Sequence, residues 1–198
     1  MDLNIMYQGK ITDIRDESAN DSHDCLTLHF KNGINFIQTQ KDNNILERLT
    51  ALFNEKGNQA FDLYVDDRKI QMSEFRKLSY SLNYNEMSFL NRKRKLKSMI
   101  KGSSTLTDVF EISDDLLNTR FESLWHYSYL CSLAVGLSKN KKIFLFPYLP
   151  CKECFIQVYR LNLICSYADS DDMIAIIPTD NVTYHGANIE CAYNLIKI

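Results

Sequence analysis

Hydrophobic positions along the chain change their spacing from two residues to three or four residues and back, which predicts both strands and helices. Apolar and polar residues alternate over residues 3–14 and 25–30, and short, mainly apolar segments stand at 34–37, 143–146 and 173–177. Alternation is typical of a strand with one buried face, whereas a continuous apolar run is typical of a strand in a parallel sheet buried on both faces. The pattern predicts N-terminal antiparallel strands, with 3–14 at an edge, and parallel core strands in a layered α/β fold.

Three other segments place apolar residues on one face of a helix, at spacings of three and four residues. The three faces are Ile45, Leu46, Leu49, Leu52 and Phe53; Leu130, Leu133, Ala134 and Leu137; and Phe155, Val158, Tyr159 and Leu163. Gly57 follows the first face as a stop signal for its helix. Further strands are expected at 61–65, 78–82 and 193–198.

A polar stretch separates these two halves of the pattern. Residues 83–125 are expected to form a helical subdomain inserted into a single domain that covers 1–198. Ser113 precedes two aspartates, as at the start of a helix. The stretch also contains a basic run, which consists of Arg92, Lys93, Arg94, Lys95 and Lys97.

The composition is that of a folded protein, with 198 residues, 45% hydrophobic residues and a net charge of −2. These values exclude a disordered or low-complexity chain and give no overall attraction to nucleic acid. No apolar run reaches the ~18 residues of a membrane-spanning helix, and the first residues do not read as a secretory signal. The six cysteines are therefore expected to be reduced and buried, in a cytoplasmic protein.

The order of the elements resembles the nucleotide-binding domain of ABC transporters. Residues 33–44 stand where that family has its phosphate-binding Walker A loop, and 45–52 resemble the helix behind it. Residues 75–82 resemble the strand before the Q-loop, with Asn83 in place of glutamine. Residues 138–146 resemble the approach to Walker B, and 173–180 resemble the strand before the switch histidine.

The chemical motifs of that family are missing from these positions. A Walker A loop needs glycines that let backbone N–H groups wrap the phosphates, yet no glycine stands between Gly33 and Gly57. Pro147 and Tyr148 follow the strand that should lead to the Walker B acids. Bulky Leu124 and Trp125 replace the glycines of the signature loop, and Asp180 stands at the place of the switch histidine.

The resemblance therefore implies a pseudo-ATPase, with no catalytic residue, no metal and no cofactor. Its loop is a degenerate phosphate loop, in which the polar residues are Gln38, Gln40, Lys41, Asp42 and Asn43. Such a bacterial subunit would scaffold or regulate a transporter complex, alone or as a homo- or heterodimer. Its partners would be a membrane permease, an active ABC ATPase subunit, or both, which would hold it at the inner face of the membrane. The basic run and Trp125 are the expected partner-binding residues.

Two other functions remain open. The basic run 92–97 is also compatible with a stand-alone nucleic-acid- or regulator-binding α/β protein, or with a solvated helix face. Cys151 and Cys154 form a CxxC pair, which a redox enzyme or half of a zinc site would use. No second pair of ligands at matching spacing accompanies them, so two incidental packing cysteines are the simpler interpretation.

Overall fold

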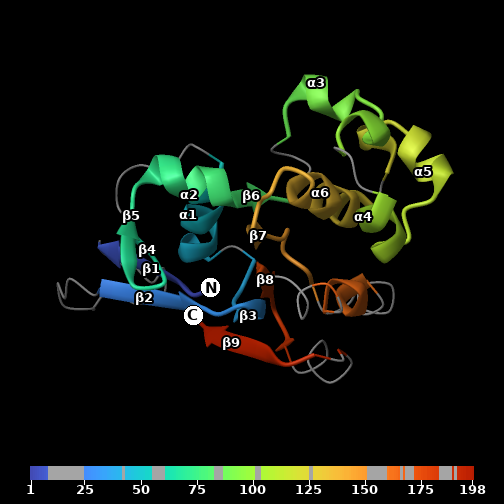
Figure 1. The fold of residues 1–198 in the computed structure, drawn as a ribbon. Helices are drawn as coiled ribbons and strands as arrows, with labels where there is room; N and C mark the ends of the chain where they lie inside the picture. The colour runs from blue at the N-terminus through green and yellow to red at the C-terminus, as the bar shows by residue number, and fades with distance from the viewer. Residues whose placement is uncertain are drawn as a thin grey trace.

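The computed structural model describes residues 1–8, 25–41, 43–54, 61–82, 87–100, 104–124, 127–150, 160–165, 167, 172–182, 189 and 191–198. Within them, an antiparallel sheet, a parallel sheet and a group of short helices lie one after another across the molecule (Figure 1). Cys151, Cys154, Gly57, Asn83 and Trp125 lie outside the described residues. So do residues 9–14 of the strand expected at 3–14 and most of the expected helix around Phe155.

The antiparallel sheet has the strand order β2-β1-β4-β5. Its strands are β1 (Leu3–Gln8), β2 (Cys25–Phe30), β4 (Phe61–Val65) and β5 (Arg68–Ile70). Ile5 of β1 lies opposite Leu28 on one side and Leu63 on the other. The prediction of β1 as an edge strand is therefore wrong, because alternation reveals which face is buried but not how many neighbours a strand has.

The parallel sheet has the strand order β6-β7-β8-β3-β9. Its strands are β6 (Ser79–Ser81), β7 (Ile143–Leu145), β8 (Ile174–Thr179), β3 (Gly33–Gln38) and β9 (Tyr193–Lys197). Every residue of β7 and β8 is buried, as their apolar runs predict. The chain enters β3 through Gly33 at φ +93°, a left-handed conformation that glycine adopts without strain.

Two helices lie on the side of the parallel sheet that faces the antiparallel one (Figure 1). Helix α1 (Asn44–Phe53) buries the five apolar residues of its predicted face. Helix α2 (Met72–Leu78) was not predicted, and the strand expected at 78–82 is only Ser79–Ser81. Met72, Phe75 and Leu78 of α2 lie three residues apart and pack at one core, but a helix of seven residues is too short for this spacing to stand out in the sequence.

The opposite side of the parallel sheet carries the other helices. They are α3 (Phe89–Arg92), η2 (Leu96–Ser98), α4 (Ser104–Val109), α5 (Asp114–Asn118), η3 (Phe121–Ser123) and α6 (Ser128–Leu137), and residues 160–165 are also helical. The Ser113 side chain accepts a hydrogen bond from the N–H of Leu116, which confirms the predicted start of α5. Helix α6 approaches the sheet at Gly136, where an added Cβ would lie 2.6 Å from the ring of Phe144.

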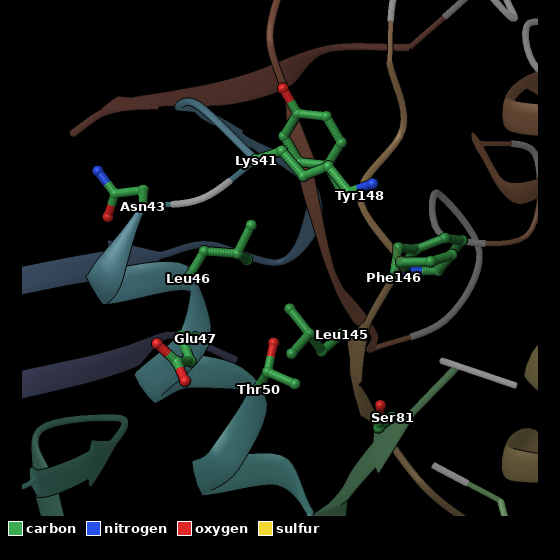
Figure 2. A pocket seen from close by; sticks show the side chains of 10 residues that line it. Lys41, Asn43, Leu46, Glu47, Thr50, Ser81, Leu145, Phe146 and Tyr148 are labelled. Atoms are coloured by element: carbon green, nitrogen blue, oxygen red, sulfur yellow. The ribbon is translucent and has the colours of Figure 1, made fainter. Parts of the chain in front are cut away.

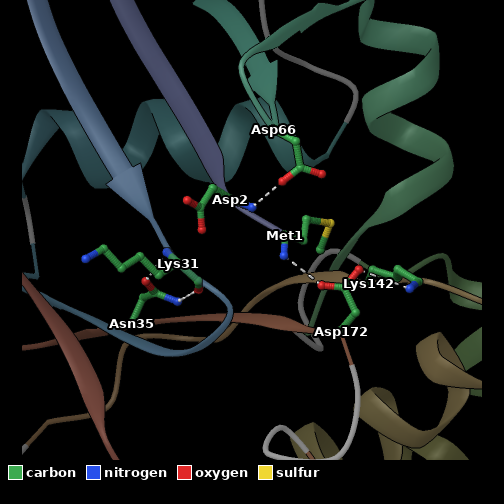
Figure 3. A network of polar contacts seen from close by, with 7 residues as sticks. All are labelled: Met1, Asp2, Lys31, Asn35, Asp66, Lys142 and Asp172. Atoms are coloured by element: carbon green, nitrogen blue, oxygen red, sulfur yellow. Dashed lines mark hydrogen bonds and ion pairs between the residues drawn. The ribbon is translucent and has the colours of Figure 1, made fainter.

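An ion-pair network joins the two sheets at the amino ends of the parallel strands (Figure 3). A carboxylate oxygen of Asp172 lies 2.9 Å from the amino group of Met1, and the other lies 3.3 Å from Lys142 Nζ. Burial alone would raise the pKa of Asp172, but hydrogen bonds from Met1 and Lys142 hold that pKa below its usual value. The first strand of the antiparallel sheet is thereby fixed to the loops that lead into β7 and β8.

The expectation of reduced thiols is wrong for two cysteines. Cys165 and Cys191 form a disulfide, with 5.7 Å between their Cα atoms, which connects the helical residues 160–165 to the start of β9. Their separation of 26 residues gives no sign of this proximity in the sequence. Cys131 is a buried free cysteine, and burial raises the pKa of its thiol to about 12.

Candidate functional site

A pocket of about 390 Å³ opens at the carboxyl ends of β6 and β7, beside the first turns of α1 (Figure 2). Its lining residues are Lys41, Asn43, Leu46, Glu47, Thr50, Ser81, Leu145, Phe146, Pro147 and Tyr148. In open α/β sheets, ligands bind outside the carboxyl ends of the parallel strands, so the pocket has the position of a ligand site. Its walls combine charged, polar and apolar side chains.

The loop 39–43, which joins β3 to α1, forms one wall of the pocket. Asn43 caps the helix, because its side-chain oxygen accepts a hydrogen bond of 2.8 Å from the N–H of Ile45. The N–H of Asn43 in turn donates to the carbonyl oxygen of Gln40 at 3.1 Å. A helix N-terminus attracts phosphate through N–H groups that have no partner within the helix. At α1 the side chain of Asn43 already takes up one of these donors.

A second contact closes the loop from the other side. The hydroxyl group of Tyr148 donates a hydrogen bond of 3.2 Å to the carbonyl oxygen of Thr39, which is itself buried. The N–H of Thr39 donates to the carbonyl oxygen of Thr179 at 2.9 Å, so the loop begins against the end of β8. The backbone between β3 and α1 is therefore held by groups of the chain itself.

The segment after β7 forms the opposite wall. Phe146 is buried and its N–H donates to the carbonyl oxygen of Ile176, and the N–H of Leu149 donates to that of Pro178, both at 2.9 Å. The chain thus continues along β8 beyond the last residue of β7. This course directs Pro147 and Tyr148 into the pocket.

The structure brings only part of the predicted loop to this pocket. Lys41 and Asn43 line it, whereas Gln38 ends β3, where its carbonyl oxygen accepts a hydrogen bond of 3.2 Å from the N–H of Ile198. Gln40 is exposed and does not line the pocket, and Asp42 lies outside the described residues.

Sequence reasoning missed three polar side chains of the pocket, Glu47, Thr50 and Ser81. The spacing of Asn43, Glu47 and Thr50 at four and three residues was the available signal, because it puts them on one face of α1. Ser81 reaches the pocket only through strand pairing of β6 with β7, which no local pattern reveals.

The basic run among the predicted partner-binding residues lies apart from this pocket, at the end of α3 and in the segment that follows it (Figure 1). Lys93, Arg94, Lys95 and Lys97 are exposed there, and Arg92 is half-buried. Lys93 Nζ lies 2.9 Å from a carboxylate oxygen of Glu122. Among the described residues, no cluster of three or more histidines, cysteines or acids is arranged to hold a metal ion.

No protein-family model and no curated protein matches the chain. Several solved structures are similar to it. A nucleotide-free ATP-binding cassette from an ABC transporter is similar over 99% of this chain and 88% of its own, with a TM-score of 0.63 and 8% identity. CbiO1 from Clostridium perfringens, part of the ABC transporter complex CbiONQ, is similar over 95% of this chain and 82% of its own, with a TM-score of 0.62 and 11% identity.

The chain has the fold of an ABC transporter ATP-binding cassette. A bacterial Atm1-family ABC exporter with ATP bound also matches over 93% of the chain, with a TM-score of 0.57 and 10% identity, and the chain spans 36% of that exporter. The predicted combination of N-terminal antiparallel strands and parallel core strands is confirmed. Of the helices that the structure describes, none is long and apolar enough to cross a bilayer.

The capping contact at the pocket is directly testable. We expect Asn43→Ala to lower the free energy of unfolding by about 1 kcal/mol, because the N–H of Ile45 loses its acceptor. Asn43→Asp keeps an acceptor oxygen and is the matched control, with stability close to that of the parent. Urea denaturation followed by circular dichroism measures both, and an equal loss in the two variants would contradict the capping role.

Proposed function

We propose that this cassette-fold protein is a non-catalytic subunit of a transporter complex, which binds other subunits and neither binds nor hydrolyses ATP. The fold supports a role beside a transporter, since the similar structures are cassettes of ABC transporters. The observation that carries the non-catalytic part is the closure of the loop 39–43 by Asn43 and Tyr148.

Binding of a triphosphate depends on backbone donors that are free to turn toward it. In this chain a side chain caps α1, and Tyr148 takes up a loop carbonyl from the opposite wall. Lys41 offers one positive charge at the pocket, but Glu47 brings a negative charge to the same pocket. Anionic phosphates would therefore meet no net positive potential from these two side chains.

Hydrolysis would need further groups. Phosphoryl transfer relies on a metal ion held by an acid and on a residue that orients the attacking water. Phe146, Pro147 and Tyr148 stand where these acids would follow β7, and Asp180 stands after β8 at the place of the switch histidine. Of these side chains only Asp180 carries a charge, so the segment that follows β7 supplies no carboxylate for a metal ion.

A cassette that does not cycle with nucleotide would serve as a fixed structural element. We place it at the inner face of the membrane, held there by a permease, by an active ABC ATPase subunit or by both. It would scaffold that complex or regulate transport through the contacts it makes.

Isothermal titration with Mg²⁺ and ATP tests the non-catalytic part. We expect no saturable heat up to about 1 mM ATP, the upper end of ordinary substrate affinities. An ATP-hydrolysing cassette titrated under the same conditions is the positive control. Micromolar binding to this chain would contradict the proposal, and its loss in Lys41→Ala would locate that binding at the loop 39–43.

Purification of the tagged chain from its native membranes in mild detergent tests the partner. We expect a polytopic permease, or an ATPase with an intact phosphate loop, to co-purify in constant ratio with the chain through a sizing column. Co-expression of the identified partner with the chain should reproduce the complex. Elution of the chain alone, with no such protein in the same peak by mass spectrometry, would contradict a subunit role.

A further inference from the structure

The outer end of the helical part exposes two neighbouring apolar side chains. Phe89 is 70% and Leu90 is 76% exposed, and both belong to the short helix α3, which lies at the end of the molecule farthest from β9 (Figure 1). The other large apolar side chains described as exposed are no more than 45% exposed. An adjacent pair of large apolar side chains with this exposure calls for a partner surface.

A basic run follows this pair in the sequence. Residues 87–100 contain five basic residues and no acid. The ammonium group of Lys93 lies 5.4 Å from the centre of the Phe89 ring, so charge and apolar surface are in direct contact. Glu122 offsets part of this charge, because its carboxylate lies 2.9 Å from Lys93 Nζ and 4.0 Å from an Arg120 guanidinium nitrogen. We call this surface the basic–apolar tip, and it is formed by Phe89, Leu90, Lys93, Arg94, Lys95 and Lys97.

The backbone of the tip is firmly held. Arg92 Nε donates to the carbonyl oxygen of Met87 at 2.9 Å, across α3. The carbonyl oxygen of Arg94 accepts from the N–H of Phe121 at 2.9 Å, and the N–H of Leu96 donates to the carbonyl oxygen of Thr119 at 3.0 Å. Leu96 itself is fully buried. Phe89 and Leu90 are thus presented on an ordered turn, which lowers the entropy cost of docking them.

The geometry points to an anionic phospholipid surface as the ligand of the basic–apolar tip. Basic side chains near such a surface are each attracted by about 1 kcal/mol, and neighbouring apolar side chains insert at the boundary of headgroups and acyl chains. A nucleic-acid backbone would satisfy the cations, but it offers no apolar environment to Leu90. The inference goes beyond the proposed function, because it gives the chain a membrane contact of its own, in addition to any partner.

Vesicle flotation with the purified full chain tests this inference. We expect binding to vesicles of phosphatidylcholine with 30% phosphatidylglycerol (roughly the charge of an anionic leaflet) and little binding to pure phosphatidylcholine. Lys95→Gln with Lys97→Gln should weaken that binding by about 30-fold, as expected for two lost cations. Phe89→Ser with Leu90→Ser should weaken it by about tenfold or more.

Matched variants elsewhere distinguish binding through the basic–apolar tip from nonspecific adsorption to vesicles. Lys31→Gln with Lys197→Gln removes two exposed charges on the sheets, and Leu195→Ser removes an exposed apolar side chain of β9, so binding should be unchanged in both. In Leu90→Trp, the emission of the added tryptophan is obtained by subtracting the spectrum of the parent chain. This emission should shift to the blue on addition of the anionic vesicles. All the variants replace exposed side chains, and circular dichroism checks that they fold.

Three results would overturn the inference. These are absence of binding to anionic vesicles, equal binding to neutral vesicles, and a salt-dependent gel shift with nucleic acid that the tip variants abolish while vesicle binding is absent. None of them bears on ATP binding or on co-purification with a permease, so the proposed function stands or falls separately.

Discussion

Side chains along β3, β7 and β8 alternate between two hydrophobic cores, and this two-sided burial constrains the rest of the molecule. Ile143 and Ile174 face the core shared with α1 and the antiparallel sheet, whereas Phe144 and Ala175 face the core shared with α6. Asn35 is a buried polar residue inside β3. Its side-chain oxygen accepts hydrogen bonds from the N–H of Lys31 and from the carboxamide of Asn194, and its side-chain nitrogen donates to the carbonyl oxygen of Lys31. Along these buried strands, side chains that could bind a ligand therefore reach solvent at the strand ends.

The carboxyl edge of the sheet carries the pocket beside α1, and there side chains of the protein itself bind the loop backbone. The carboxamide of Asn43 binds an N–H of α1 that a phosphate would otherwise attract, and the Tyr148 hydroxyl binds the loop from the opposite wall. Both contacts are ordinary stabilising hydrogen bonds. Under the proposed function, these hydrogen bonds close the loop 39–43 without a bound ligand. This suits a subunit that binds partners and does not go through a nucleotide cycle.

Strong local patterns made much of this structure predictable. The five buried residues of α1 and the apolar runs of β7 and β8 could be identified because burial on one face or on both leaves a regular signature in the sequence. Pairing between distant segments leaves none, which explains why the internal position of β1 and the disulfide between Cys165 and Cys191 were missed. The basic run was visible, yet Phe89 and Leu90 could be recognised as exposed only once α3 was placed.

A crystal structure of the chain grown with Mg²⁺ and a non-hydrolysable ATP analogue tests the central claim most directly. The account predicts that the Asn43 oxygen remains on the N–H of Ile45, and that the Tyr148 hydroxyl remains on the carbonyl of Thr39, with no triphosphate bound at α1. A triphosphate at the N-terminus of α1, with Tyr148 displaced from Thr39, would contradict it.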